Sequence, residues 1–220
     1  MLLFFRILQA PSNNITNIIN TDFVDFMRII ESSESLTSLT ELNLSNNPIE
    51  EWSDILRLSP LLPNLSILSL NECMISKITF PDNGEANWFS SLTMLQLSSC
   101  KIDNWASIEA LNALNSLVHF KLKDNPILEK ENKETCRQLI IAAIKSIKYL
   151  NGSYIEKQER RGAEIDFLKK YGKEYLLHQG NTSSSEMQNF AKSHPRYDVF
   201  PISYVYKQLG SNHVSSVTFL

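Results

Sequence analysis

The chain has 220 residues, 43% of them hydrophobic and 20% charged, with a net charge of −3 from 21 Lys and Arg against 24 Asp and Glu. This composition excludes a disordered chain and gives no support for nucleic-acid binding. No apolar run approaches the roughly 20 residues of a membrane span. Three cysteines without a CxxC pair favour a reducing compartment, and the start MLLFFRIL lacks the cationic stretch of an export signal, so we expect a cytoplasmic protein.

Four segments of the chain share one pattern, L-x-x-L-x-L-x-x-N/C-x-I/L, without gaps. They are residues 39–49, 65–75, 92–102 and 117–127, and their starts lie 26, 27 and 25 residues apart. A degenerate fifth copy begins at Phe5, 34 residues before the next one. Pattern and period are those of leucine-rich repeats, each of which supplies one strand to a stacked parallel sheet.

The spacing within each copy has a physical cause. Leu42 and Leu44 are two residues apart, so they point to the same side of a strand. At the following turn, we expect the amide of Asn47 to satisfy backbone groups where the chain bends. Cys73 and Cys100 stand at the same step, which predicts small buried thiols rather than reactive ones.

Helical returns are predicted between the strands, as in Glu51–Leu61 and Ala106–Leu114. Trp52 and Trp105 follow the turn residues Asn47 and Cys100 by five positions each, and we expect them to anchor the outer layer. The stretch 79–87, with Pro81 and Gly84, is expected to form an excursion before the next strand.

A helical cap is predicted after the last repeat. The apolar positions predict a helix over Asn132–Tyr149, with Lys145 and Lys148 near its end and Asn151-Gly152 breaking it. A second helix is predicted over Lys157–Leu177, with a buried stripe of Ala163, Phe167, Tyr171 and Tyr175. The expected domains are therefore repeats over 1–127, a helical cap over 128–177, and a linker and tail over 178–220.

Charge is divided along the chain. Residues 133–174 hold ten basic and six acidic side chains, whereas residues 1–60 hold three basic and eight acidic ones. A solvated helix surface and an acidic partner explain the basic cap residues equally well; these are Arg160, Arg161, Lys169, Lys170 and Lys173.

No catalytic pattern is present in the sequence. The four histidines, at 119, 178, 194 and 213, show no metal-ligand spacing with the cysteines, and Cys136 falls on the apolar stripe of the cap helix. There is no GxxxxGK[ST], GxGxxG or GxSxG motif. We therefore predict a non-enzyme with no catalytic residues, no metal site, no cofactor and no small-molecule substrate.

The residues that alternate with the leucines are expected to form the concave face of the solenoid. A protein partner suits this face better than a small molecule, although a merely solvated face is the alternative. The predicted partner-binding residues are Glu41, Asn43, Ser45, Ile67, Ser69, Asn71, Met94, Gln96, Ser98, His119, Lys121 and Lys123, and the degenerate first copy would add Ile7, Gln9 and Pro11. The face runs from acidic to basic, which predicts that an acidic surface of the partner meets Lys121 and Lys123.

The cap carries a more specific resemblance. Residues 125–176 resemble the cap of the tubulin-specific chaperone E family, and the resemblance extends over roughly 5–197. The markers are Asn125-Pro126, Arg137-Gln138-Leu139-Ile140-Ile141-Ala142, Leu150-Asn151, Glu159-Arg160-Arg161, Ala163-Glu164 and Tyr171-Gly172, with Phe80-Pro81-Asp82 and His194-Pro195-Arg196-Tyr197 flanking them. The closely related cofactor-E-like family, which lacks the CAP-Gly domain, is the alternative resemblance.

The resemblance implies an α/β fold, a leucine-rich-repeat solenoid with helices on the convex side, closed by a C-terminal helical cap. It also implies a cytoplasmic, cytoskeleton-associated chaperone that binds α-tubulin, acts in assembly and dissociation of the α/β-tubulin heterodimer, and works with other tubulin-folding cofactors. The family's CAP-Gly and ubiquitin-like domains are not recognisable here, so we expect a shortened form or a fragment. A scaffold of ribonucleoprotein or phosphatase complexes is the alternative.

Overall fold

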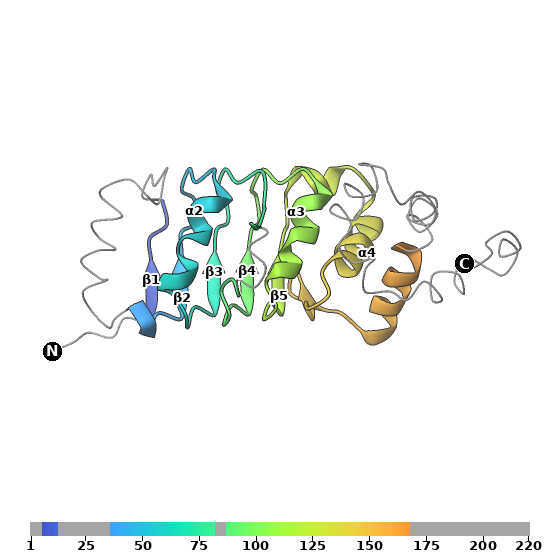
Figure 1. Cartoon of the computed structure of the whole chain (residues 1–220). Coiled ribbons are helices and arrows are strands. Elements are labelled where there is room, and N and C mark those ends of the chain that lie inside the picture. Colours follow the sequence, from blue (N-terminus) through green and yellow to red (C-terminus); the bar gives the residue numbers. More distant parts are fainter. Residues whose placement is uncertain (1–5, 13–35, 82–86, 168–220) are drawn as a thin grey trace, which may run out of the picture.

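The computed structural model describes residues 6–12, 36–81 and 87–167 (Figure 1). These residues form a seven-stranded sheet whose spatial order follows the chain. The strands are β1 (Ile7–Gln9), β2 (Glu41–Asn43), β3 (Ile67–Ser69), β4 (Met94–Gln96), β5 (His119–Lys121), β6 (Tyr149–Leu150) and β7 (Ser153–Tyr154). All neighbours pair in parallel except β6 and β7, which are antiparallel.

The register of the sheet confirms the predicted repeats, including the degenerate first copy. Leu8 pairs with Leu42, Leu42 with Leu68, Leu68 with Leu95, and Leu95 with Phe120. From Leu42 onward these central side chains are at most 2% exposed. Removing such apolar surface from water is the main force that stacks one repeat on the next.

The turn after each strand links neighbouring repeats through one side chain. The Nδ2 of Asn47 donates to the carbonyl of Ala10 at 2.8 Å, and that of Asn125 donates to Leu97 at 2.7 Å. Cys73 and Cys100 reach the equivalent carbonyls, Leu44 and Leu70, at 3.4 and 3.2 Å from Sγ. The predicted roles of these Asn and Cys residues are therefore confirmed, and each bond crosses to the preceding repeat. We call these four side chains the ladder residues, and their places in the repeat the ladder positions.

A left-handed backbone residue precedes each of these four ladder positions; they are Asn46, Glu72, Ser99 and Asp124, with φ between 54° and 58°. Ser12, at φ 59°, stands at the same step of the first copy. None of the five is glycine, although this conformation strains most side chains.

Short helices cover one face of the sheet (Figure 1). The return over 51–61 contains α2 (Trp52–Leu56) and the 3₁₀ helix η2 (Ser59–Leu61). The return predicted over 106–114 begins one residue earlier, with α3 (Trp105–Ala110), and continues with η3 (Leu111–Ala113). A further 3₁₀ turn, η1, spans Leu36–Ser38. Trp52 is 2% exposed and Trp105 packs half-buried against the core, as expected for anchors of this layer.

The excursion at 79–87 is only partly described, because residues 82–86 lie outside the described ranges. Its start is held by aromatic contacts. Phe80 meets the ring of Trp52 edge-on, with centroids 5.9 Å apart, and lies 6.3 Å from the ring of Trp88. The described start of the excursion thereby packs on the helical layer.

The cap begins with η4 (Pro126–Glu129) and α4 (Lys133–Ala143). The prediction of one helix over Asn132–Tyr149 is wrong at its C-terminal end. The helix begins as expected, with the Asn132 side chain accepting from the backbone N of Thr135 and Glu134 in the first turn. It ends at Ala143, since Ile144 takes an extended backbone conformation. Side chains from other segments of the chain then bind the backbone groups at this end of the helix.

Those partners come from residues far apart in the sequence. The Nδ2 of Asn112 donates to the carbonyl of Ala143 at 2.6 Å, and its Oδ1 accepts from the backbone N of Lys145 at 3.0 Å. Lys145 and Lys148 thus lie beyond the helix. Asn151 and Gly152, at φ of 53° and 87°, form the turn of the β6–β7 hairpin rather than a helix stop.

The second cap helix begins at residue 157 and continues to 167, the end of the described residues. Ala163 and Phe167 are buried as predicted, whereas Tyr171 and Tyr175 lie outside the described residues. The predicted tail over 178–220 also lies outside them. In the described part of the chain, no helix has the length and apolar character to cross a membrane.

Candidate functional site

The predicted partner-binding residues lie in three rows on the sheet face opposite the helices. We call this surface the ladder face; it is distinct from the Asn and Cys ladder residues of the turns. Neighbours within a row are about 4.8 Å apart, and adjacent rows are about 7 Å apart along the strands. The first row is Ile7, Glu41, Ile67, Met94, His119 and Tyr149; the second is Gln9, Asn43, Ser69, Gln96 and Lys121. The third, just past the strands, is Pro11, Ser45, Asn71, Ser98 and Lys123.

The third row keeps register because backbone hydrogen bonds continue beyond the strands. The N of Asn46 donates to the carbonyl of Asn71 at 2.7 Å, and the N of Glu72 to that of Ser98 at 2.8 Å. The N of Ser99 does the same for Lys123 at 2.8 Å. The three rows therefore form one continuous surface.

Polar side chains of the second and third rows bind one another. Asn43 donates to Oε1 of Gln9 at 2.8 Å, and the Nζ of Lys121 lies 3.3 Å from Oε1 of Gln96. The Oδ1 of Asn71 accepts from the backbone N of Ser98 at 2.9 Å. These contacts hold the polar rows in a fixed arrangement.

The first row is more apolar than the other two. Ile67 and Met94 are half-buried in its middle, and Ile7 is 51% exposed at its start. Glu41 lies on β2, whereas Lys121 and Lys123 lie at the β5 end. The ladder face thus combines an apolar centre with opposite charges on separate repeats.

Two aromatic residues extend the ladder face beyond the predicted set. Tyr149 stacks on His119, with centroids 4.4 Å apart and ring planes 8° apart, and Tyr154 meets Tyr149 edge-on at 5.3 Å. Tyr154 is 48% exposed. The signal that would have found them is Asn151-Gly152, which favours a two-residue hairpin turn.

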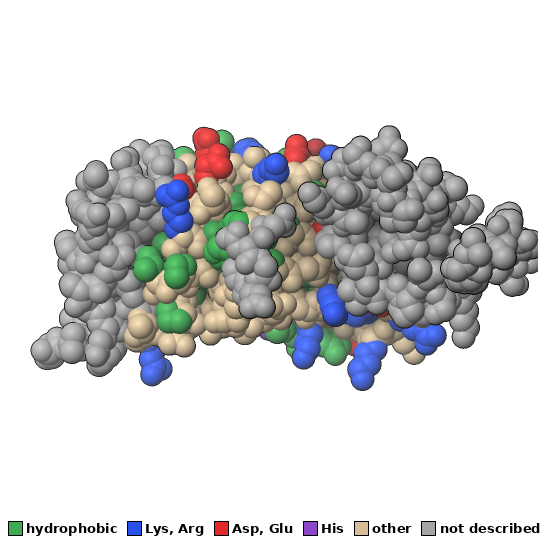
Figure 2. Space-filling model, in the orientation of Figure 1, with side chains coloured by type: hydrophobic (Ala, Val, Ile, Leu, Met, Phe, Trp, Pro, Cys, Tyr) green, Lys and Arg blue, Asp and Glu red, His purple; other side chains and the backbone are tan. Residues whose placement is uncertain are grey.

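The side of the molecule that faces the reader in Figure 1 carries side chains of both charges. In Figure 2, acidic side chains lie mainly along the upper edge, while basic ones are scattered along both edges with apolar patches between them. No patch of uniform sign stands out on the side that this view presents.

The cysteines are structural. Cys73, Cys100 and Cys136 are buried free thiols. Burial raises the pKa of Cys100 to about 12 and that of Cys73 above its usual value. Both therefore stay protonated and are poor nucleophiles. Among the described residues, no three His, Cys, Asp or Glu side chains are grouped to hold a metal.

A cavity of about 490 Å³ lies between the β5 end of the ladder face and the cap. Its lining mixes basic Lys123, Lys133 and Arg137 with acidic Asp124 and Glu129, over apolar side chains such as Ile140. This mixture favours no single ligand charge.

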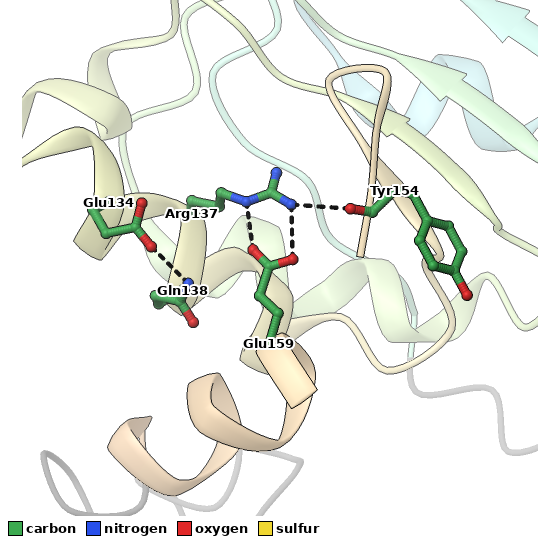
Figure 3. Close-up of polar contacts among 5 residues, drawn as sticks. All are labelled: Glu134, Arg137, Gln138, Tyr154 and Glu159. Carbon is green, nitrogen blue, oxygen red and sulfur yellow. Dashed lines mark hydrogen bonds and ion pairs between the residues drawn. The ribbon is translucent and has the colours of Figure 1, made fainter. Parts of the chain in front are cut away.

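The cap markers of the sequence have structural roles. Arg137 forms a two-pronged ion pair with Glu159, at 2.6 Å from Nε to Oε1 and 3.1 Å from Nη2 to Oε2 (Figure 3). Its Nη2 also donates to the carbonyl of Tyr154 at 3.5 Å, while Gln138 binds Glu134 one helical turn away. The pair thus ties α4 to the hairpin and to the second cap helix.

Arg160 completes the same arrangement. Its Nη1 donates to the carbonyls of Ile141 at 2.9 Å and Ile144 at 3.3 Å, and its Nη2 donates to that of Ile147. Burial lowers the pKa of Arg160, an effect that nearby Glu164 and Glu159 oppose. Arg160 is therefore occupied within the cap, so of the two interpretations offered for the basic cap residues, neither applies to it.

Known proteins match both the repeats and the cap. A family model described as "Leucine-rich repeat" matches residues 27–178. Tubulin-specific chaperone E of Xenopus laevis is 36% identical over 169 residues, 74% of this chain and 32% of that protein. Tubulin-folding cofactor E of Arabidopsis thaliana is 32% identical over 162 residues, 71% of this chain and 29% of that protein.

A cofactor E-like relative and one solved structure complete the comparison. The human tubulin-specific chaperone cofactor E-like protein is 31% identical over 130 residues, 59% of this chain and 31% of that protein. A chain in the Drosophila melanogaster SNF/U2A' complex superimposes with a TM-score of 0.56 at 20% identity, covering 78% of this chain and 86% of that one. The latter likeness shows the fold alone.

The chain spans about a third of the length of the curated relatives it matches. The chain therefore belongs to the leucine-rich-repeat family, in which its repeats and cap correspond to the repeat portion of tubulin-specific chaperone E.

Proposed function

We propose that this chain is a non-enzymatic tubulin-folding cofactor that binds α-tubulin through its ladder face and takes part in assembly and dissociation of the α/β-tubulin heterodimer. The observation that carries the proposal is the 36% identity over 169 residues to tubulin-specific chaperone E, which runs through repeats and cap without being confined to the leucines. Such a cofactor would act in the cytoplasm beside the microtubule cytoskeleton, together with other tubulin-folding cofactors.

The ladder face supports the proposal because most of its side chains lie outside the core. The leucines supply the core, and the ladder Asn and Cys residues supply the turns, so the alternating side chains reach the surface, with the exception of Ser69, which is 8% exposed. In the middle of the first row, Ile67 and Met94 present apolar surface among polar neighbours. Half-exposed apolar groups inside a polar rim are where binding energy concentrates in protein interfaces.

Binding of purified α/β-tubulin to the immobilised protein tests the proposal. We expect a Kd in the micromolar range or tighter at low salt. Met94→Glu should raise the Kd about tenfold by placing a charge in the apolar centre. Met74→Glu is the matched control, because Met74 is 44% exposed but lies outside the three rows. Absence of binding at micromolar protein, with the protein folded, would refute the proposal.

Heterodimer dissociation is measured separately, with tubulin labelled by a fluorescent donor on one subunit and an acceptor on the other. Loss of energy transfer on adding the wild-type protein, but not on adding Met94→Glu, would support a direct role. Binding without such a loss would leave the chain as a tubulin-binding module and remove heterodimer dissociation from its role.

A further inference from the structure

One corner of the ladder face combines aromatic surface with positive charge. It is formed by His119, Lys121, Lys123, Tyr149 and Tyr154, and is called here the aromatic–basic corner. The rings of His119, Tyr149 and Tyr154 come from three consecutive strands, β5, β6 and β7, and pack on one another. Because Tyr154 is 48% exposed, its ring presents a flat apolar surface to solvent.

The lysines of the corner are not required by the repeat. In the second row, the position of Lys121 is taken in the other repeats by Gln9, Asn43, Ser69 and Gln96. In the third row, the position of Lys123 is taken by Ser45, Asn71 and Ser98. Every earlier repeat in the described chain uses a neutral side chain where β5 uses a cation. The fold alone thus does not explain the two lysines.

Among the described residues, no carboxylate pairs with either lysine. Lys121 contacts Oε1 of Gln96 at 3.3 Å, and Lys123 is exposed. The ion pairs of Arg57 with Asp54 and of Arg137 with Glu159 lie outside the corner. With His119 two residues before Lys121 on the same face, three basic groups lie within about 14 Å of strand.

The corner therefore offers adjacent sites for two kinds of group. Carboxylates would meet the lysines, and an apolar side chain would meet the exposed ring of Tyr154. Aromatic rings bury much apolar area at low entropy cost, and complementary charge accelerates encounter. The acidic residue of the face, Glu41, lies on β2, three strands from β5, so an acidic segment bound at the corner is not repelled at close range.

We propose that the aromatic–basic corner binds an acidic segment of a protein partner, with carboxylates against Lys121 and Lys123 and an apolar side chain against Tyr149 and Tyr154. The inference rests on the proposed function in taking tubulin as the protein that carries the segment. It adds the chemistry that is recognised and the place on the ladder face where recognition occurs.

Two variants separate the charged part from the aromatic part. Lys121→Glu with Lys123→Glu should raise the Kd for α/β-tubulin about tenfold at low salt and flatten its salt dependence. Tyr154→Ser should raise the Kd about fivefold and leave the salt dependence unchanged, since it removes apolar contact alone. Should Tyr154→Ser fail to fold, Tyr154→Gln replaces it.

Each variant has a matched control. Lys77→Glu with Lys101→Glu makes the same change of charge at two exposed lysines outside the rows, and Met74→Ser removes an equally exposed apolar side chain. Both controls should bind tubulin within twofold of wild type. Thermal unfolding checks that all variants are folded.

The outcomes distinguish this proposal from the proposed function. If the wild type binds tubulin and both corner variants bind within twofold of it, the corner proposal is overturned and the proposed function stands. If the wild type does not bind tubulin, the proposed function fails and a random copolymer of glutamate and tyrosine becomes the probe. Copolymer binding that both corner variants lose then supports the corner; no binding, or binding that they retain, overturns it.

Discussion

The repeat array (residues 36–127) and the cap (residues 128–167) are held together by different kinds of contact. In the array, each contact recurs in the next repeat, as when Asn47, Cys73, Cys100 and Asn125 each reach a carbonyl one repeat back. In the cap, the polar contacts that join separate segments do not recur and link residues 13 to 33 positions apart, as with Arg160 to Ile147 and Asn112 to Lys145. The array tolerates replacement of one ladder residue by another, whereas the cap depends on particular charged groups.

The largest expected effect comes from the cap. Arg160→Ala leaves the carbonyls of Ile141, Ile144 and Ile147 without their donor and should cost about 3 kcal/mol of unfolding free energy. Hydrogen exchange should report the loss mainly in α4 and β6. The control is Arg161→Ala, at the exposed neighbouring position, which we expect to change stability by less than about 0.5 kcal/mol. Equal effects of the two variants would contradict the cap role of Arg160.

Substitution of a ladder residue in the array should cost less unfolding free energy than the loss of Arg160. Asn125→Ala removes bonds to Leu97, Leu122 and Lys123 from a side chain that is 1% exposed, and should cost about 2 kcal/mol by chemical denaturation. Asn125→Cys should restore roughly half of the loss, because two other repeats already use cysteine there. If cysteine is no better than alanine, the two ladder chemistries are not interchangeable.

A pH effect is expected from α3, the array helix that contacts α4. Burial raises the pKa of Glu109 to about 8, so the folded chain holds a proton that the unfolded chain releases above its ordinary 4.5. Stability is therefore lost as pH rises from 4.5 to 8. Glu109→Gln lacks this titration, so its unfolding free energy relative to wild type should rise by on the order of 1–2 kcal/mol from pH 5 to pH 8, as measured by urea unfolding. Parallel pH curves for the two proteins would rule this out, and exposed Glu134→Gln is the control.

The smallest expected effect is that of the Arg137–Glu159 ion pair. Both side chains are 23% exposed, so solvent screens them in part and a double-mutant cycle should give a coupling of about 1 kcal/mol. The coupling should fall in high salt. A value near zero would mean that the pair sets the geometry of the cap without stabilising it.

The same contrast explains which parts of the structure could be predicted from the sequence. Strand register, the buried Asn and Cys steps and the three rows of the ladder face follow from a period repeated four times, so each copy corroborates the others. The end of α4 could not be derived in this way. Apolar spacing continues through Ile144 and Ile147, and only the side chains of Asn112 and Arg160, distant in the sequence, divert the backbone there.

The candidate site shows the same limit. His119, Lys121 and Lys123 fall in place by register, but Tyr149 and Tyr154 join them through a hairpin outside the repeat period. The two residues Asn151-Gly152 are compatible with a helix stop and with a hairpin turn. The pairing of Tyr149 with His119 decides between them, and that pairing is a tertiary contact.

The reversal of direction at β7 has a consequence for self-association. Every strand from β1 to β6 runs the same way and presents its neighbour with the same edge, so a parallel stack of this kind has no intrinsic length. The Asn151-Gly152 turn folds the chain back after two residues, and β7, also of two residues, leaves only a short last edge in the described sheet. Short edge strands are poor templates for another chain. At this end of the described sheet, therefore, the hairpin leaves little unpaired backbone on which a strand of a second molecule could add.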